Sequence, residues 1–157
     1  MKRVNVIPVS EHEKADFWKH FQNYLAEYAT IAGLTPASDH PSYPWFDLYW
    51  TETDRRWPFW AKVEAEVCGL ALIRRDDDGK TEMAEFYIHP QFRRRGLGIM
   101  FARKLFVRFS GHWKLGQLKS NKAAISFWRR VLDGYVQYAE MQSGHDGERI
   151  EQHFVIP

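Results

Sequence analysis

Apolar positions recur along the chain in two periods, and these divide it into a series of expected strands and helices. Residues 3–9 alternate as a strand does. Ser10, with Glu13 three residues later, forms a capping-box pattern that starts a helix. This helix buries one face, because its large apolar side chains fall at helical spacing: Phe17, Phe21, Tyr24, Leu25 and Tyr28. A turn-rich loop with three prolines follows at 33–44, and a short helix is expected around 45–53.

The rest of the chain alternates strands with two further helices. The first turn between strands is expected near Glu66 or Gly69, and the run 76–80 predicts a hairpin turn. Pro90 stops one strand, and Gly134 ends the last helix. The expected strands are 59–66, 67–75, 81–89, 113–119, 135–141 and 149–156, and the expected helices are 98–109 and 121–132. The order β-α-α-β-β-β-α-β-α-β-β predicts an α/β sandwich with a mixed sheet.

Length and composition narrow the class of protein without identifying it. With 157 residues, 45% of them hydrophobic, the chain fits one domain, 1–157, with a substantial core. No apolar run approaches the roughly 20 residues of a membrane helix, and the start of the chain lacks a signal-peptide stretch. Cys68 is the single cysteine, so no intramolecular disulfide is expected. We expect a cytoplasmic protein with no membrane partner; a homodimer remains open.

Charge is distributed unevenly, although the net value is only +2. No Asp or Glu occurs between Glu85 and Asp133, whereas this stretch holds eleven Lys and Arg. The remainder of the chain carries eleven basic residues against all twenty acidic ones. Such asymmetry indicates two ligands of opposite charge. The alternative is a basic, solvated helix face without a ligand.

The basic stretch contains a glycine-rich loop between an expected strand and an expected helix. Gly96 and Gly98 lack side chains that would keep a ligand from the backbone, and Arg93, Arg94 and Arg95 stand beside them. Amide N–H groups and the dipole at a helix start attract anions, and guanidinium groups add forked donors. The loop therefore suits a pyrophosphate.

Other phosphate-binding patterns fit this loop less well. A dinucleotide fingerprint needs a third glycine where Phe101 stands, and an acidic residue about 20 positions later, which the chain lacks. The Gly-Lys-Ser/Thr of a Walker loop is absent. No recognisable nucleic-acid module surrounds the arginines, so we expect no nucleic-acid partner. A plain basic turn remains the alternative.

Two motifs resemble those of the Gcn5-related N-acetyltransferase (GNAT) family. Residues 93–98 are similar to its Gln/Arg-x-x-Gly-x-Gly/Ala signature, and 86–90 resemble the strand that leads into it. Residues 121–128 match its second motif, Asn-x-x-Ala-x-x-Phe-Tyr, except that Trp128 replaces the tyrosine. The motif similarity covers roughly 82–135. The resemblance implies an acyl-CoA N-acyltransferase sandwich: a mixed, mostly antiparallel sheet of about seven strands with helices on both faces.

The resemblance also implies a cofactor, acetyl-CoA as acyl donor, and residues that hold it. The pyrophosphate would bind the backbone amides of 94–99, with Arg93 closing over it. The pantetheine arm would lie where the strand ending at Ile88 and strand 113–119 splay apart. Asn121 would bond to the arm or act as a helix N-cap. Ala124 and Phe127 would lie near the arm or in the core. The implied cofactor-binding residues are Tyr87, Ile88, Arg93, Arg94, Arg95, Gly96, Leu97, Gly98, Ile99, Asn121, Ala124 and Phe127.

For catalysis, the resemblance implies direct attack of a neutral amine on the thioester, with a group that removes a proton. Glu85, on the strand expected to pass the thioester, is the candidate base; an ordinary ion pair is the alternative, and His89 is a weaker candidate. Trp128 cannot supply a proton as the family's tyrosine does. Tyr135, Tyr138 and Ser126 are the candidate substitutes. The alternative is that the thiolate leaves with help from water, because a thiol pKa of about 8.5 tolerates departure without an acid.

The acceptor side is expected between residues 39 and 60, where aromatic side chains and carboxylates crowd together. Aromatic faces and carboxylates suit a cationic acceptor, so we expect a small-molecule amine bound with help from Asp47 or Glu52. A core aromatic cluster with an acidic rim is the alternative. No metal site is expected.

The sequence thus predicts an enzyme that acetylates an amine. A non-catalytic acetyl-CoA sensor of the same fold is the alternative that Trp128 keeps open, and a basic nucleic-acid binder is a third.

Overall fold

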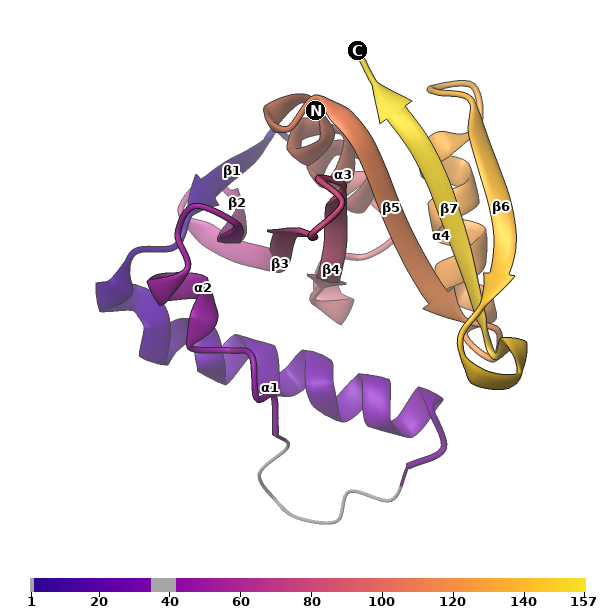
Figure 1. Cartoon of the computed structure of the whole chain (residues 1–157). Helices are drawn as coiled ribbons and strands as arrows, with labels where there is room; N and C mark the ends of the chain where they lie inside the picture. Colours follow the sequence, from indigo (N-terminus) through magenta and orange to yellow (C-terminus); the bar gives the residue numbers. More distant parts are fainter. Residues whose placement is uncertain (1, 35–41) are drawn as a thin grey trace.

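A computed structural model describes residues 2–34 and 42–157, which build one seven-stranded sheet with helices on both faces (Figure 1). The sheet order is β1-β2-β3-β4-β5-β7-β6. The strands are β1 (Val4–Pro8), β2 (Arg56–Val63), β3 (Glu66–Arg75), β4 (Thr81–Ile88), β5 (Gly111–Leu118), β6 (Tyr138–Ser143) and β7 (Arg149–Ile156). The helices are α1 (Lys14–Ile31), α2 (Leu48–Thr51), α3 (Leu97–Arg108) and α4 (Lys122–Leu132), with 3-10 turns η1 (Glu11–Glu13), η2 (Pro90–Phe92) and η3 (His145–Gly147). The predicted element order and the mixed, mostly antiparallel sheet are confirmed.

Strands β4 and β5 form the one parallel pair among the described strands, and they pair only briefly. The ladder joins Thr81 to Trp113 and Glu82 to Lys114, and no further pairing joins the two strands. Beyond these positions β5 leads away from β4 (Figure 1). The rest of β4, from residue 83 to 88, therefore has ladder partners only in β3.

Two apolar layers hold the helices against the sheet. Helices α3 and α4 cover one face, where Phe101, Leu105 and Val131 are fully buried. Helix α1 and the single turn α2 cover the other face over the first four strands (Figure 1). There Phe17 and Phe21, two of the predicted stripe residues, are fully buried. In the described residues no helix combines the length and apolar character that a membrane crossing requires.

Several element boundaries differ from the predicted ones. The turn between β2 and β3 lies before Glu66, because Glu64 adopts a left-handed conformation with φ 57°. The capping box is present, and the carboxylate of Glu13 accepts the backbone N–H of Ser10 at 3.2 Å, but the first turn is 3-10 rather than α. Strand β2 begins three residues earlier than predicted and β6 three residues later. The predicted proline-rich loop lies mostly outside the described residues.

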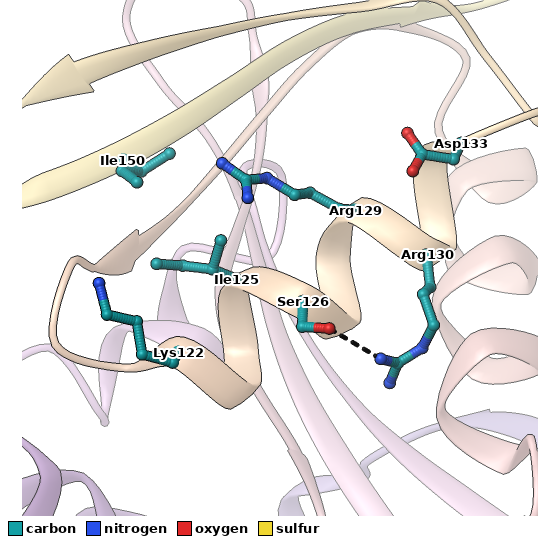
Figure 2. A pocket seen from close by; sticks show the side chains of 7 residues that line it. All are labelled: Lys122, Ile125, Ser126, Arg129, Arg130, Asp133 and Ile150. Atoms are coloured by element: carbon teal, nitrogen blue, oxygen red, sulfur yellow. Dashed lines mark hydrogen bonds between the residues drawn. The ribbon is translucent and has the colours of Figure 1, made fainter.

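A buried amide network joins β5, β7 and α4. Gln117 and Gln152 are 4% and 0% exposed, and their side-chain amides bond to each other reciprocally at 2.7 and 3.0 Å. Gln152 also donates to Glu140, which forms a two-bond ion pair with Arg129 of α4. Arg129 extends from α4 toward Ile150 of β7, whereas Arg130 turns away and donates to Ser126 (Figure 2).

We expect Gln117→Leu to destabilise the protein by about 1–3 kcal/mol, because the buried amide of Gln152 loses its partner. Equilibrium urea denaturation measures the change. Gln137→Leu is the matched control, since residue 137 is exposed. An equal urea midpoint for Gln117→Leu and the unchanged protein would contradict the assignment.

Candidate functional site

The predicted phosphate loop forms a strained turn between η2 and α3. Arg94 and Gly96 both have positive φ angles, 63° and 76°. At position 96 this conformation favours glycine, because a side chain there costs energy in the left-handed region. A Cβ built on Gly96 would meet no described atom within 4 Å, so the turn opens away from the rest of the described chain.

Six consecutive backbone N–H groups of this loop have no acceptor in the described part of the chain. They belong to residues 94–99, and the first helical bond of α3 runs from the N–H of Met100 to Gly96 at 3.2 Å. Unpaired amides at a helix start carry partial positive charge and bind anions. The loop therefore fits a pyrophosphate, as its sequence predicts.

Gly98 is required for the packing of α3 against α4, a role that the sequence did not indicate. A Cβ at this position would lie 2.9 Å from Cε1 of Phe127 and 3.4 Å from Cγ1 of Ile88. Gly98 therefore allows α3 and α4 to approach each other closely, a packing role in addition to the predicted ligand access. Phe127 and Ala124 pack against the core on this face of the sheet.

Arg93 is bound to the protein rather than extended into the loop. Its Nε donates to the carbonyl oxygen of Ile88 at 2.8 Å, and its two terminal nitrogens donate to both carboxylate oxygens of Glu27 at 2.9 and 2.7 Å. The guanidinium also lies over the ring of Tyr87, 5.4 Å from its centroid. The carboxylate of Glu27 raises the pKa of Arg93 further.

Most cations of the basic stretch also have structural partners. Lys104 and Arg108 of α3 donate to Val4 and Val6 at the edge of the sheet, and Arg103 donates to Val131. Lys114 and Arg129, like Arg93, pair with carboxylates, and Arg130 donates to Ser126. Among the described residues of this stretch, four cations have neither a carboxylate partner nor a side-chain hydrogen bond: Arg94, Arg95, Lys119 and Lys122.

These four cations lie at one end of the sheet. Arg94 and Arg95 follow β4, whereas Lys119 and Lys122 follow β5 and begin α4. Because β4 and β5 are parallel, both pairs lie at the end where the two strands have separated. The cations without partners thus lie at the same end of the sheet as the unpaired amides.

Asn121 occupies the N-cap position of α4, which was one of the two roles predicted for it. Its Oδ1 accepts the backbone N–H of Ala124 at 3.1 Å. This bond satisfies one of the free amides at the helix start.

A bulge in β4 decides which face of the sheet Glu85 occupies. Leu72 pairs with Glu85, but the next residue of β3, Ile73, pairs with Met83, which leaves Ala84 without a partner. Both Ala84 and Glu85 consequently face the α1 layer. Alternation alone could not settle this orientation.

Glu85 lies partly buried between two tyrosines. The hydroxyl of Tyr24 on α1 donates to Oε1 at 2.5 Å, and the hydroxyl of Tyr43 donates to Oε2 at 2.8 Å. Burial raises the pKa of Glu85 above its usual value, although both hydroxyl bonds act to lower it. The competing interpretation, an ordinary ion pair, is not what the structure shows: no described cation lies within salt-bridge distance of this carboxylate.

Tyr24 and Tyr43 were not predicted as partners of Glu85. Tyr24 was predicted only as part of the buried stripe of its helix, and Tyr43 only as part of the aromatic region between residues 39 and 60. The available signal was the phenolic hydroxyl, since a buried tyrosine on a helix that covers a sheet usually needs an acceptor.

His89 lies on the same face of the sheet as Glu85, the face that α1 covers, and its side chain is buried. It is 6% exposed, and its Nε2 lies 2.8 Å from Nδ1 of His20. Burial, together with His20 and Arg93, lowers the pKa of His89. His89 therefore links α1 to the end of β4.

Trp128 fills the core between α4 and the sheet. It is 6% exposed, and its ring meets Phe86 edge-on with centroids 4.9 Å apart. The three predicted substitutes for a proton donor each have a contact of their own. Ser126 accepts from Arg130, Tyr138 donates to Asp133, and Arg103 lies over the ring of Tyr135.

Asp47 and Glu52 are paired with neighbouring cations and do not contact Glu85. Asp47 binds Lys14 at 2.7 Å with its side chain 79% exposed, and Glu52 binds Arg56 at 2.8 Å. Of the aromatic residues around them, Phe46, Tyr49 and Trp60 belong to the core, which favours the structural interpretation for these three.

Three solved structures share the fold and are distant from this chain in sequence. An acetyltransferase from Thermus thermophilus is similar over 99% of this chain and 97% of its own, with TM-score 0.69 and 15% identity. The ribosomal-protein-S18-alanine N-acetyltransferase from Escherichia coli matches with TM-score 0.61 and 14% identity over 98% of this chain and 93% of its own. The PaiA N-acetyltransferase from Thermoplasma acidophilum was solved with coenzyme A. It matches with TM-score 0.64 and 12% identity over 97% of this chain and 98% of its own.

A comparison with curated proteins finds no match. A model of the acetyltransferase (GNAT) family, in which acetyl-CoA is the typical acyl donor, matches residues 18–133. This span contains most of α1, the bulged strand with Glu85, the amide loop and the whole of α4. The chain belongs to the GNAT family of acetyltransferases.

Proposed function

We propose that this chain is a single-domain enzyme, residues 1–157, that transfers an acetyl group from acetyl-CoA to a primary amine of a small cationic acceptor. One observation carries the proposal: the unpaired amides of 94–99 and the carboxylate of Glu85 lie along one continuous segment, beside the opening between β4 and β5. An anion site and a candidate base are thereby joined by one strand.

For the cofactor, we assign the pyrophosphate to the amides of residues 94–99, with charge from Arg94 and Arg95. The arm would lie beside the free edge of β4, near the main chain of Tyr87 and Ile88 and the side chains of Asn121, Ala124 and Phe127. Acetyl-CoA supplies the activated acyl group. The backbone of β4 then orients its carbonyl, and a main-chain N–H there stabilises negative charge that develops on oxygen.

For the proton, we assign the base role to Glu85. Its raised pKa suits removal of a proton from an ammonium group, since a more basic carboxylate accepts a proton more readily. Tyr24 and Tyr43 fix the carboxylate in place through both of its oxygens. We assign no general acid, because a thiol with a pKa of about 8.5 can depart without one.

For the acceptor, the supporting feature is the carboxylate of Glu85 framed by two phenol rings, which favours an amine that carries positive charge. Asp47 and Glu52 would contribute only from the rim, because both are already paired. By its name, the similar E. coli protein modifies an alanine of a ribosomal protein. Peptides with a free N-terminus are therefore the second acceptor class to test.

The proposal is tested by thermal shift with acetyl-CoA, followed by mass spectrometry of products from polyamines, amino sugars, amino acids and short peptides. We expect a rise in melting temperature with acetyl-CoA and acetylated products from the cationic small amines. Binding without any product would support the sensor alternative, for which the buried Trp128 is the specific observation. No binding of the nucleotide would contradict both functions.

A further inference from the structure

Helix α1 contacts the segment from β4 to the amide loop through three polar pairs at regular spacing. The pairs are His20–His89, Tyr24–Glu85 and Glu27–Arg93. On α1 these residues follow the i, i+4, i+7 spacing of one helix face. One face of one helix thus holds the candidate base, the end of β4 and the start of the loop.

The Glu27–Arg93 pair is the contact nearest to the loop, and it occupies all the nitrogens of the guanidinium. Nε is bound to the carbonyl of Ile88, and both terminal nitrogens are bound to Glu27. A bidentate pair fixes the plane of the guanidinium as well as its distance. Arg93 is therefore anchored from two sides.

This anchor stands directly before the strained turn. Arg94, the next residue, has φ 63°, and Gly96 follows with φ 76°. Glycine adopts this conformation freely, but a residue such as Arg94 keeps it only where the surroundings hold it. The contacts of Arg93 provide that hold on the chain entering the turn.

We propose that Glu27 is a positioning residue for the cofactor: through Arg93 it holds the unpaired amides of 94–99 in the geometry that receives a pyrophosphate. The inference rests on the proposed function, because it concerns the same loop. It differs from the family resemblance, which would have Arg93 close over the pyrophosphate itself. The guanidinium acts here as the anchor of the loop.

The alternative is competition, in which Glu27 withholds Arg93 from the cofactor. The two cases predict opposite results for the same substitution. Removing a positioning carboxylate weakens cofactor binding, whereas removing a competitor frees Arg93 and strengthens it. The sign of the change in affinity decides between them.

The experiment is calorimetric titration of coenzyme A into the unchanged protein, Glu27→Gln and a control. We expect Glu27→Gln to raise the Kd about tenfold, within the range found for coupled contacts. Asp16→Asn is the control, because Asp16 is an exposed carboxylate on the same helix with no side-chain bond in the described structure. Its Kd should equal that of the unchanged protein.

A second measurement separates positioning from a general loss of stability. The side chains of Glu27 and Arg93 are 36% and 40% exposed, so their pair contributes little to folding. We expect the melting temperature without ligand to stay unchanged in Glu27→Gln. The KM for acetyl-CoA should rise with the Kd, while kcat at saturating acetyl-CoA remains the same.

A double-mutant cycle completes the test. Arg93→Gln should weaken binding at least as much as Glu27→Gln, because it also removes the bond to Ile88, and the double variant should bind no more weakly than Arg93→Gln. A tighter or unchanged Kd in Glu27→Gln overturns the inference but leaves the proposed function standing. If the unchanged protein does not bind coenzyme A, both fail.

Discussion

Glu85→Gln is expected to lower kcat/KM about 10²- to 10⁴-fold, the usual contribution of a general base. The amide keeps the size of the side chain and accepts a hydrogen bond from Tyr24 or Tyr43, but it cannot take a proton from the acceptor. Cofactor binding should not change, since the amides of 94–99 are untouched. Steady-state kinetics with the best acceptor, combined with calorimetry for coenzyme A, measures both quantities.

The pH profile gives the same assignment an independent test. A base must be unprotonated to act, so activity falls as the pH drops below its pKa. Because burial raises the pKa of Glu85 from 4.5, the acid limb of kcat/KM should lie above that value. Glu85→Gln should lose this limb from its residual activity.

Tyr24→Phe is the matched variant for this profile. It removes a hydroxyl bond that stabilises the carboxylate and lowers its pKa, so the acid limb should move to higher pH. If Glu85→Gln keeps most of its activity, or if the limb stays in place in Tyr24→Phe, Glu85 is not the base.

The fold was predictable because most elements carry local signals. The stripe of α1, the capping box at Ser10 and the glycine after α4 each indicate an element directly, and the structure confirms them. The β2–β3 turn was placed wrongly because it turns at Glu64, which is not a glycine. Gly69 instead permits a close approach within the sheet, since a Cβ there would collide with the carbonyl oxygen of Tyr87.

The candidate site was only partly predictable because its decisive contacts join segments distant in sequence. The amide loop could be predicted from a single stretch, 93–98. The partners of Glu85 could not, because they depend on a bulge at Ala84 and on the way α1 lies across the sheet. The anchoring of Arg93 likewise joins residues 66 positions apart. The basic stretch without acids predicts an anion site, which stays a prediction, and most of its cations have structural partners instead.

Gly96→Val is expected to abolish detectable binding of coenzyme A. At φ 76° a β-branched side chain is strongly disfavoured, and even an ordinary residue costs about 1–2 kcal/mol there. No described atom lies within 4 Å of the added Cβ, so the cost arises from the backbone rather than from a collision. The turn should relax toward negative φ, and the amides of 94–99 then no longer point to one place.

The thermal shift produced by coenzyme A measures this loss, and the chain offers a matched control. Gly79, in the β3–β4 hairpin, has φ 81° and equally open surroundings. Gly79→Val should therefore destabilise the protein by a similar amount while it keeps the full shift with coenzyme A. If Gly96→Val is folded and binds as the control does, the pyrophosphate is held elsewhere. The proposed pyrophosphate site therefore depends on a left-handed backbone at position 96, which glycine adopts without strain, as well as on charge.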